Sequence, residues 1–152
     1  YISATFSELT ASFSLSEVNK LNWEDLFFIV YLNKIEPHLK SFPFLIIKEF
    51  PHQLAALSKI RPDDPNVCER FEWYMNGVEI GNCFHELTDL NEQKARFRKQ
   101  QSERKSLYRS EMPTPEVLFK ALNRGLPPSS GIAVGVERLF SSITLSDNPF
   151  WE

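Results

Sequence analysis

The chain has 152 residues, of which 42% are hydrophobic and 13 are phenylalanine, so it is long and apolar enough to bury a core as a single domain. Its 17 lysine and arginine residues against 20 aspartate and glutamate residues give a formal charge of -3. This composition excludes an intrinsically disordered chain, and it excludes a general nucleic-acid binder, because such a protein needs an excess of positive charge.

The two cysteines, Cys68 and Cys83, stand in no paired-cysteine or Cys/His spacing, so neither a disulfide scaffold nor a structural zinc site is expected. This cysteine usage predicts a protein of the reducing cytoplasm. No secretory signal opens the chain, and its longest apolar run, Leu26 to Leu32, is far shorter than the roughly 20 residues that span a bilayer. The first residue is Tyr1 rather than methionine, which predicts a fragment or a processed chain. With no internal repeat and no linker, residues 1–152 are expected to form one domain.

The first third of the chain is expected to be helical. Apolar residues at helix-like spacing between positions 6 and 13, followed by the capping-box pattern Ser14-Leu-Ser-Glu17, predict two short helices. From Leu21 through Ile35 an apolar stripe of helical period predicts a core helix, which Pro37 is expected to stop.

A β-rich segment follows. Residues Phe42–Phe50 predict a buried strand that ends at Pro51. Gln53–Leu57 predicts a short helical turn, and Arg61–Pro65 has the proline and aspartate chemistry of a surface loop.

The strongest local signal is a β-hairpin. Glu69–Met75 alternates between bulky and polar residues, Asn76-Gly77 is typical of a two-residue hairpin turn, and Val78–Phe84 predicts the return strand. This pairing places Glu72 and Glu79 on neighbouring antiparallel strands, where both carboxylates could approach one cation.

A long basic helix is predicted next. Thr88 is expected to cap a helix over Leu90–Leu107 that carries many lysine and arginine residues. Such a face is most often only solvated, and the alternative is a contact with an acidic protein. Residues 112–115 break the chain before a short helix over Glu116–Asn123, which Gly125 ends.

The segment Gly131–Phe140 combines a strand pattern with a helix start. Small residues at positions 131, 133 and 135 alternate with bulky ones, which predicts a strand with one nearly bare face. That face could be the floor of a nucleotide site, or it could admit a closely packed helix. Glu137 and Arg138 then open a helix, and the guanidinium at its start suits stacking and phosphate oxygens.

Two of these segments resemble one enzyme family. Residues 125–139, Gly-Leu-Pro-Pro-Ser-Ser-Gly-Ile-Ala-Val-Gly-Val-Glu-Arg-Leu, resemble the third signature motif of class II aminoacyl-tRNA synthetases in its lysyl version, and residues 70–89 resemble the lysyl-type segment that precedes it. Within that family the match is closest to the lysyl-type paralogues that modify elongation factor P. The resemblance implies an α+β fold, with an antiparallel sheet flanked by helices as in the class II catalytic core.

The resemblance also implies a nucleotide site. ATP and Mg²⁺ are the expected ligands, with Glu72 and Glu79 serving the metal. Arg138 matches the arginine that stacks on adenine and reaches the γ-phosphate, so it is the expected catalytic residue. The residues matched to ATP binding are Glu79, Ile80, Gly135 and Arg138.

An amino-acid site is implied beside it, formed by Asn82, Phe84, Glu86 and Ala133. Glu86 matches the acidic residue that pairs with the substrate amine, whereas Phe84 is equally compatible with simple packing. Lysyl-tRNA synthetases have glycine at the position of Ala133, and the paralogues that modify elongation factor P have alanine. An extra methyl group in a tight pocket fits a preference for (R)-β-lysine over α-lysine.

The implied activity is ATP-dependent activation of (R)-β-lysine or lysine as an adenylate and its transfer to a lysine of elongation factor P in the cytoplasm, with neither tRNA nor a membrane as partner. The family is homodimeric, but its first motif, which builds the dimer interface, and its second motif have no counterpart here. Arg70-Phe-Glu72 matches the short Arg-x-Glu pattern of the second motif, yet its place before Asn76-Gly77 assigns it to the hairpin. The alternatives are a truncated, inactive synthetase-like domain with a binding or regulatory role, and a fragment of a lysyl-tRNA synthetase.

Overall fold

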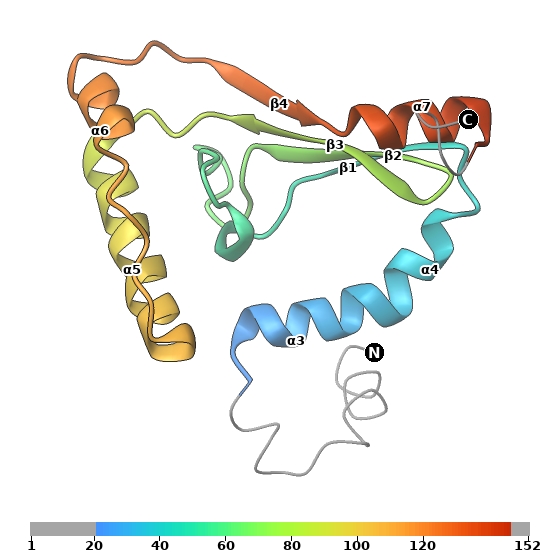
Figure 1. The fold of residues 1–152 in the computed structure, drawn as a ribbon, viewed down its shortest axis with the longest axis horizontal. Coiled ribbons are helices and arrows are strands. Elements are labelled where there is room, and N and C mark those ends of the chain that lie inside the picture. The colour runs from blue at the N-terminus through green and yellow to red at the C-terminus, as the bar shows by residue number, and fades with distance from the viewer. Residues whose placement is uncertain (1–20, 147–152) are drawn as a thin grey trace. The chain divides into compact units, whose positions relative to one another are not determined.

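The computed structural model describes residues 21–146, so the two short helices expected in the chain before Leu21 lie outside the described residues. The described chain alternates helices with four strands (Figure 1). In chain order the elements are α3 (Trp23–Val30), the π-helix η1 (Tyr31–Ile35), α4 (Glu36–Leu39), β1 (Phe44–Lys48), the 3-10 helix η2 (His52–Leu54), β2 (Arg70–Met75), β3 (Val78–His85), α5 (Leu90–Tyr108), α6 (Glu116–Asn123), β4 (Ser130–Val134) and α7 (Val136–Thr144).

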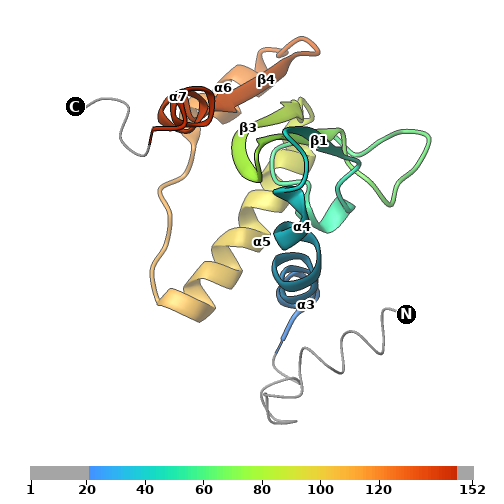
Figure 2. The same ribbon diagram turned by 90° about the vertical axis from the view of Figure 1, so that its right-hand side faces the viewer.

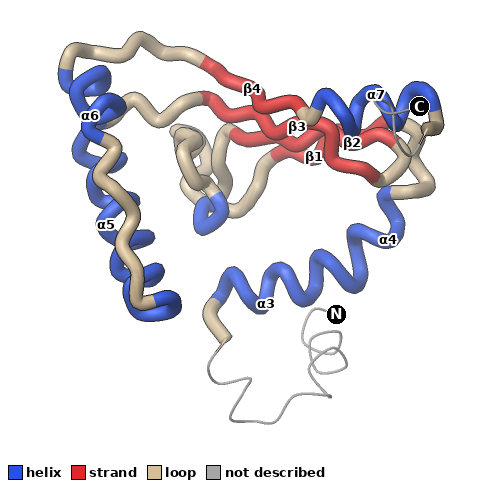
Figure 3. Tube along the Cα trace, viewed as in Figure 1, coloured by secondary structure: helices blue, strands red, loops and turns tan. Residues whose placement is uncertain are grey.

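The strands form one antiparallel sheet in the order β1-β2-β3-β4, which together with the helices confirms the expected α+β class (Figure 3). The chain groups into two compact units. The first unit contains the chain up to Ile47, Glu72–Asn82 and the chain from Val134 onward, and the second contains Lys48–Phe71 and Cys83–Ala133. That residues 1–152 form a single domain stays a prediction.

The predicted hairpin is present, and its turn needs both of its residues. Asn76 and Gly77 have φ values of 50° and 80°, the left-handed conformation that a two-residue turn matching the strand twist requires. A Cβ atom on Gly77 would also lie 3.0 Å from the backbone nitrogen of Lys40. Glycine is therefore required here both by conformation and by space.

Pro37 does not stop the first helix, contrary to the sequence prediction. Helical geometry continues from Trp23 through Leu39, and Figures 1 and 2 show α3 and α4 as one run. The π-helix η1 makes this possible, because the Glu36 N–H donates to the carbonyl of Tyr31, five residues back, and so widens the turn just before the proline ring. Pro37 then lies in the first turn of α4, a position at which proline is tolerated.

The strand predicted over Phe42–Phe50 is shorter and less buried than expected. It spans Phe44–Lys48, and the side chains of Phe44 and Ile46 are 57% and 49% exposed. β1 is an outer strand of the described sheet, so only one of its edges is paired with another strand, and the face that carries Phe44 and Ile46 is exposed. An apolar run is equally typical of central and outer strands, which is why the pattern could not tell them apart.

Downstream of β1 most predicted elements are confirmed. The short turn appears as η2, residues 61–65 form a loop, α6 has the predicted bounds, and Gly125 follows it with a φ of 90°. The cap of α5 is Asp89 rather than Thr88, since the Asp89 side chain accepts the Glu92 N–H at 2.7 Å. Both residues are good cap formers, and the carboxylate adds a favourable charge at the helix start.

Within the second unit, one basic residue of α5 anchors this helix to the segment that contains Ala56 and Ser58. Arg96 Nη1 donates to the carbonyls of Ala56 and Ser58, both at 2.8 Å, while its guanidinium also pairs with Glu92. The ring of Phe97 meets Phe119 of α6 edge to face, 5.9 Å between centroids. Between residues 21 and 146, every helix is too short or too polar to cross a bilayer.

Candidate functional site

In the first unit, a glycine joins β4 to α7 beside β3. The Gly135 N–H donates to the carbonyl of Ile80 at 2.8 Å, and Gly135 is the residue that precedes the first turn of α7. A Cβ atom at this position would lie 3.3 Å from Cδ of Arg138. The bare glycine therefore leaves room for the Arg138 stem to lie along the junction.

Arg138 reaches back to β3 from the start of α7. Its Nη1 donates to the backbone carbonyl of Glu79 at 3.1 Å and lies 3.9 Å from Oε2 of the same residue. The two side chains are 60% and 38% exposed, so the ion pair adds little to stability. Both contacts use Nη1, and among the described residues the other guanidinium nitrogens have no partner, which leaves them for a ligand.

The first unit also contains a buried carboxylate that accepts a hydrogen bond from a tyrosine hydroxyl. Glu72 is only 7% exposed, and the Tyr74 hydroxyl donates to its Oε2 at 2.7 Å. The hydroxyls of Tyr31 and Tyr74 are 3.3 Å apart, and because Tyr74 gives its proton to Glu72, Tyr31 is the donor to Tyr74. Burial raises the pKa of both phenols, so this chain of hydrogen bonds keeps its protons at neutral pH.

Glu72 and Glu79, the two carboxylates expected to serve a metal, belong to the same unit, and the charge of each acts on the Tyr31 phenol. Burial is the main cause of the raised pKa of Tyr31, and the negative charges of Glu72, Glu36 and Glu79 add to it. Mg²⁺ is commonly held by one or two carboxylates together with phosphate oxygens, so these donors fit that ion. Their joint role in metal binding stays a prediction.

Removing the Tyr74 hydroxyl is expected to destabilise the protein. Tyr74→Phe takes a hydrogen bond from a buried carboxylate and should lower the free energy of unfolding by about 1–3 kcal/mol. Tyr31→Phe, at the outer end of the chain, is the matched control and should cost only about 0.5–1.5 kcal/mol. Urea denaturation measures both, and equal losses would show that Glu72 does not depend on Tyr74.

In the second unit, Glu86 lies between two neighbouring segments. Its N–H donates to the carbonyl of Ser129 at 2.9 Å on one side, and it forms an isolated antiparallel bridge with Ser58 on the other. The half-buried carboxylate makes no hydrogen bond or ion pair with any residue between 21 and 146. A carboxylate in this position has lost water without gaining a cation.

The negative charge of Glu86 acts on Cys83 of β3. Burial raises the pKa of the Cys83 thiol, and the negative charge of Glu86 raises it further. Cys83 therefore stays a protonated thiol at neutral pH.

The other residues matched to the amino-acid site are placed as follows. Phe84 packs under the guanidinium of Arg70, which lies 5.5 Å from its ring centroid, so packing accounts for this side chain. Ala133 is exposed on β4, and because strand side chains alternate, its methyl group projects from the same face as position 131. Asn82, half-buried on β3, belongs to the first unit.

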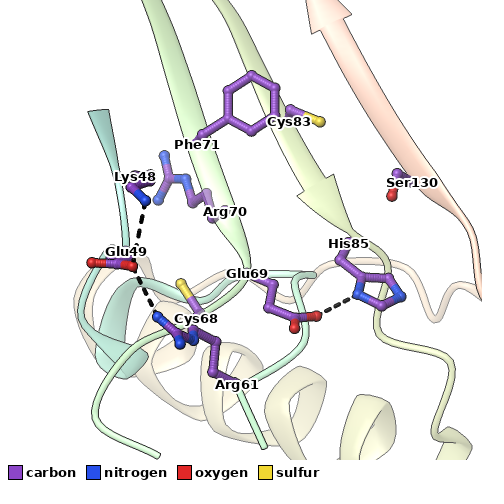
Figure 4. Close-up of a pocket in the computed structure, with 10 residues that line it drawn as sticks. All are labelled: Lys48, Glu49, Arg61, Cys68, Glu69, Arg70, Phe71, Cys83, His85 and Ser130. Atoms are coloured by element: carbon purple, nitrogen blue, oxygen red, sulfur yellow. Dashed lines mark hydrogen bonds and ion pairs between the residues drawn. The ribbon is translucent and has the colours of Figure 1, made fainter. Parts of the chain in front are cut away.

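A cavity of about 320 Å³ in the second unit was not predicted (Figure 4). Its charged side chains pair with one another: Arg61 lies 2.8 Å from Glu49, and His85 Nδ1 contacts Glu69 Oε2. No motif pointed to it, because its residues come from segments far apart in the sequence. The lining residues are Lys48, Glu49, Arg61, Cys68, Glu69, Arg70, Phe71, Cys83, His85 and Ser130.

The sequence was compared with protein families and with curated proteins. Residues 3–148 match the family described as tRNA synthetases class II (D, K and N). Three similar curated proteins are each named elongation factor P–(R)-β-lysine ligase. The protein of Buchnera aphidicola (subsp. Acyrthosiphon pisum, strain APS) is 40% identical over 125 residues, or 80% of this chain and 38% of the relative. That of Edwardsiella ictaluri is 39% identical over 134 residues (87% and 41%), and that of Vibrio cholerae is 42% identical over 105 residues (69% and 32%).

The chain thus spans about two fifths of the length of the curated relatives it matches. The family match nevertheless covers nearly all of its residues, including both segments that carry the resemblance, and the α+β architecture agrees with it. The chain belongs to the class II tRNA synthetases of the D, K and N type.

Proposed function

We propose that the protein containing this chain activates (R)-β-lysine, or lysine, with ATP and transfers it to a lysine side chain of elongation factor P. The names of the relatives support the substrate and the acceptor. The observation that carries the proposal is Glu86, a half-buried carboxylate without a cation partner among residues 21–146, at the position where the lysyl-type pocket receives an amine.

The first step joins the amino acid to the nucleotide. An oxygen of the amino-acid carboxylate attacks the α-phosphorus of ATP, the bond to the β-phosphate oxygen breaks, and pyrophosphate leaves. The residues of this chain would contribute by positioning the two reactants and by stabilising the negative charge on the phosphate oxygens. Arg138 offers its remaining donors to adenine and the γ-phosphate, and Gly135 and Ile80 let the nucleotide approach the main chain. Mg²⁺, held by Glu72 and Glu79, would neutralise the phosphate charge.

The second step passes the acyl group on. The acceptor amine attacks the acyl carbon, AMP leaves, and the amine loses its proton. The charge of -3 on the chain gives no support for a tRNA as acceptor, whereas the relatives' names support a protein. Throughout, Glu86 would hold the substrate ammonium, and a site built for a cation discriminates strongly against analogues that lack one.

Ala133 is the residue expected to favour the β-amino acid. Ala133→Gly should improve the use of α-lysine relative to (R)-β-lysine, because a single methyl group in a close pocket discriminates by about 1–3 kcal/mol, or roughly 10- to 200-fold. The ratio of kcat/KM for the two isomers measures the change. An unaltered ratio would remove Ala133 from the specificity determinants.

The experiment that tests the proposal is ATP–pyrophosphate exchange by the complete gene product, with (R)-β-lysine and α-lysine compared. Exchange that depends on one of the lysines, followed by transfer of the labelled amino acid to elongation factor P, is the expected result. A folded protein that binds neither ATP nor lysine would instead support the alternative, an inactive synthetase-like domain. Transfer to tRNA rather than to elongation factor P would assign the chain to a lysyl-tRNA synthetase.

A further inference from the structure

The carboxylate of Glu86 occupies the space that a side chain at position 131 would fill. A Cβ atom built on Gly131 would lie 3.6 Å from the carboxyl carbon of Glu86 and would overlap its Oε1. Both residues belong to the second unit, and the Glu86 N–H bond to Ser129 fixes their backbones side by side. The carboxylate therefore rests directly on the bare backbone of β4.

Conformation does not explain this glycine. Gly131 lies within β4, and its φ lies outside the left-handed range that other residues avoid, whereas Gly77 and Gly125 have φ values of 80° and 90°. An alanine could adopt the same backbone geometry as Gly131. What excludes a side chain here is the Glu86 carboxylate alone.

Contacts from other side chains do not hold Glu86 in place either. Among residues 21–146 no donor pairs with its carboxylate, so no hydrogen bond or ion pair fixes it, and the bare backbone of Gly131 is what gives it room to lie against β4. Any side chain at position 131 would push the carboxylate away from β4. The position at which the ammonium group of a substrate could pair with the Glu86 carboxylate would then change as well.

We infer that Gly131 is a positioning residue for the amino-acid site: the missing side chain recesses the Glu86 carboxylate onto β4 and so sets the length of the amine-bearing substrate that the site accepts. This inference rests on the proposed function. The neighbouring Ala133 projects from the same face of β4, so two successive positions of one face would shape the site. Position 131 would set where the Glu86 carboxylate lies, and position 133 would contact the backbone of the substrate.

The test is a double-mutant cycle in the complete gene product, with Gly131→Ala, Glu86→Asp and the double variant. Gly131→Ala should raise KM for the amino acid by about ten- to a hundredfold, as expected for one displaced charge-assisted hydrogen bond, and leave KM for ATP unchanged. Glu86→Asp should weaken the wild-type protein, because the shorter side chain falls short of the amine. In the Gly131→Ala background it should instead restore affinity, because it makes room for the new methyl group.

The control and a second readout separate this inference from the proposed function. Ile132→Val changes the opposite, exposed face of β4 and should alter neither KM. The alkylation rate of Cys83 is the second readout, because the Glu86 charge raises the pKa of that thiol. Displacing the carboxylate in Gly131→Ala should change this rate, and the double variant should return it toward wild type, whether or not the protein has activity. The thermal midpoint should change little, because the end of a flexible side chain moves aside at low cost. If wild type shows no lysine-dependent exchange, the proposed function fails while the Cys83 cycle still reports on Gly131. Additive effects in both readouts would overturn the inference.

Discussion

Replacing Arg138 with alanine is expected to weaken ATP binding by about ten- to a hundredfold. The guanidinium is held at the edge of β3 by a single nitrogen, and its remaining donors have no partner among the described residues, so they could serve a ligand. A charge-assisted hydrogen bond to phosphate contributes about 1.5–3 kcal/mol, which is the origin of the expected loss. Calorimetric titration with ATP measures it directly.

Arg138→Lys separates charge from geometry at this position. Lysine keeps the positive charge but lacks the planar fork, so most of the loss should remain. Arg124→Ala is the matched control, because it removes an exposed arginine of the second unit and should leave ATP binding unchanged. The stability of the Arg138 variants should stay near wild type, since the pair with Glu79 is largely exposed. ATP affinity equal to wild type in Arg138→Ala would exclude this residue from the nucleotide site.

Replacing Glu86 with glutamine is expected to raise KM for (R)-β-lysine or lysine by about ten- to a hundredfold and to leave ATP binding unchanged. Glutamine has nearly the same shape but no charge, so the ammonium of the substrate would lose its counter-ion in a half-buried position. Because Glu86 has no cation partner among residues 21–146, the substitution should not break any interaction within the described chain. A wild-type KM for the amino acid would contradict the proposed role.

Cys83 offers an independent measure of the Glu86 charge. That charge and burial together raise the thiol pKa, so the Glu86→Gln substitution should lower it while burial continues to act. Below the thiol pKa, alkylation of Cys83 should therefore be faster in the variant at the same pH. Bound lysine should have the same effect in wild type, because its ammonium offsets the carboxylate. Mass spectrometry of the alkylated peptide distinguishes Cys83 from the buried Cys68.

Elements with strong local signals could be predicted from the sequence. The Asn76-Gly77 turn demands two residues in the left-handed conformation and therefore appears where the pattern places it. The helix over Glu116–Asn123 is bounded by proline on one side and glycine on the other. Pro37 misled the prediction because a proline breaks an α-helix, whereas a wider π turn ahead of it avoids the clash. Local pattern alone does not show which kind of turn precedes a proline.

Only part of the candidate site could be predicted from the sequence. Resemblance named Glu72, Glu79 and Glu86, but it did not reveal the hydroxyls of Tyr31 and Tyr74, which lie 43 residues apart in the chain. The contact between Gly131 and Glu86 was hidden for a related reason. A small residue in a strand admits a packed helix or a flat ligand equally well, and only the structure shows that a carboxylate fills the space.

The π turn at Tyr31–Ile35 also bears on how this segment can vary among relatives. A π turn holds one more residue than an α turn of the same helix, so the chain can lose or gain a residue there and remain helical. A single-residue gap in alignments is therefore expected between positions 31 and 36. Its presence should be coupled to whether position 37 is proline, because without the ring the ordinary turn fits. Because the wider turn absorbs the extra residue, the helix on either side keeps its orientation, so such a gap should leave Tyr31 facing Tyr74.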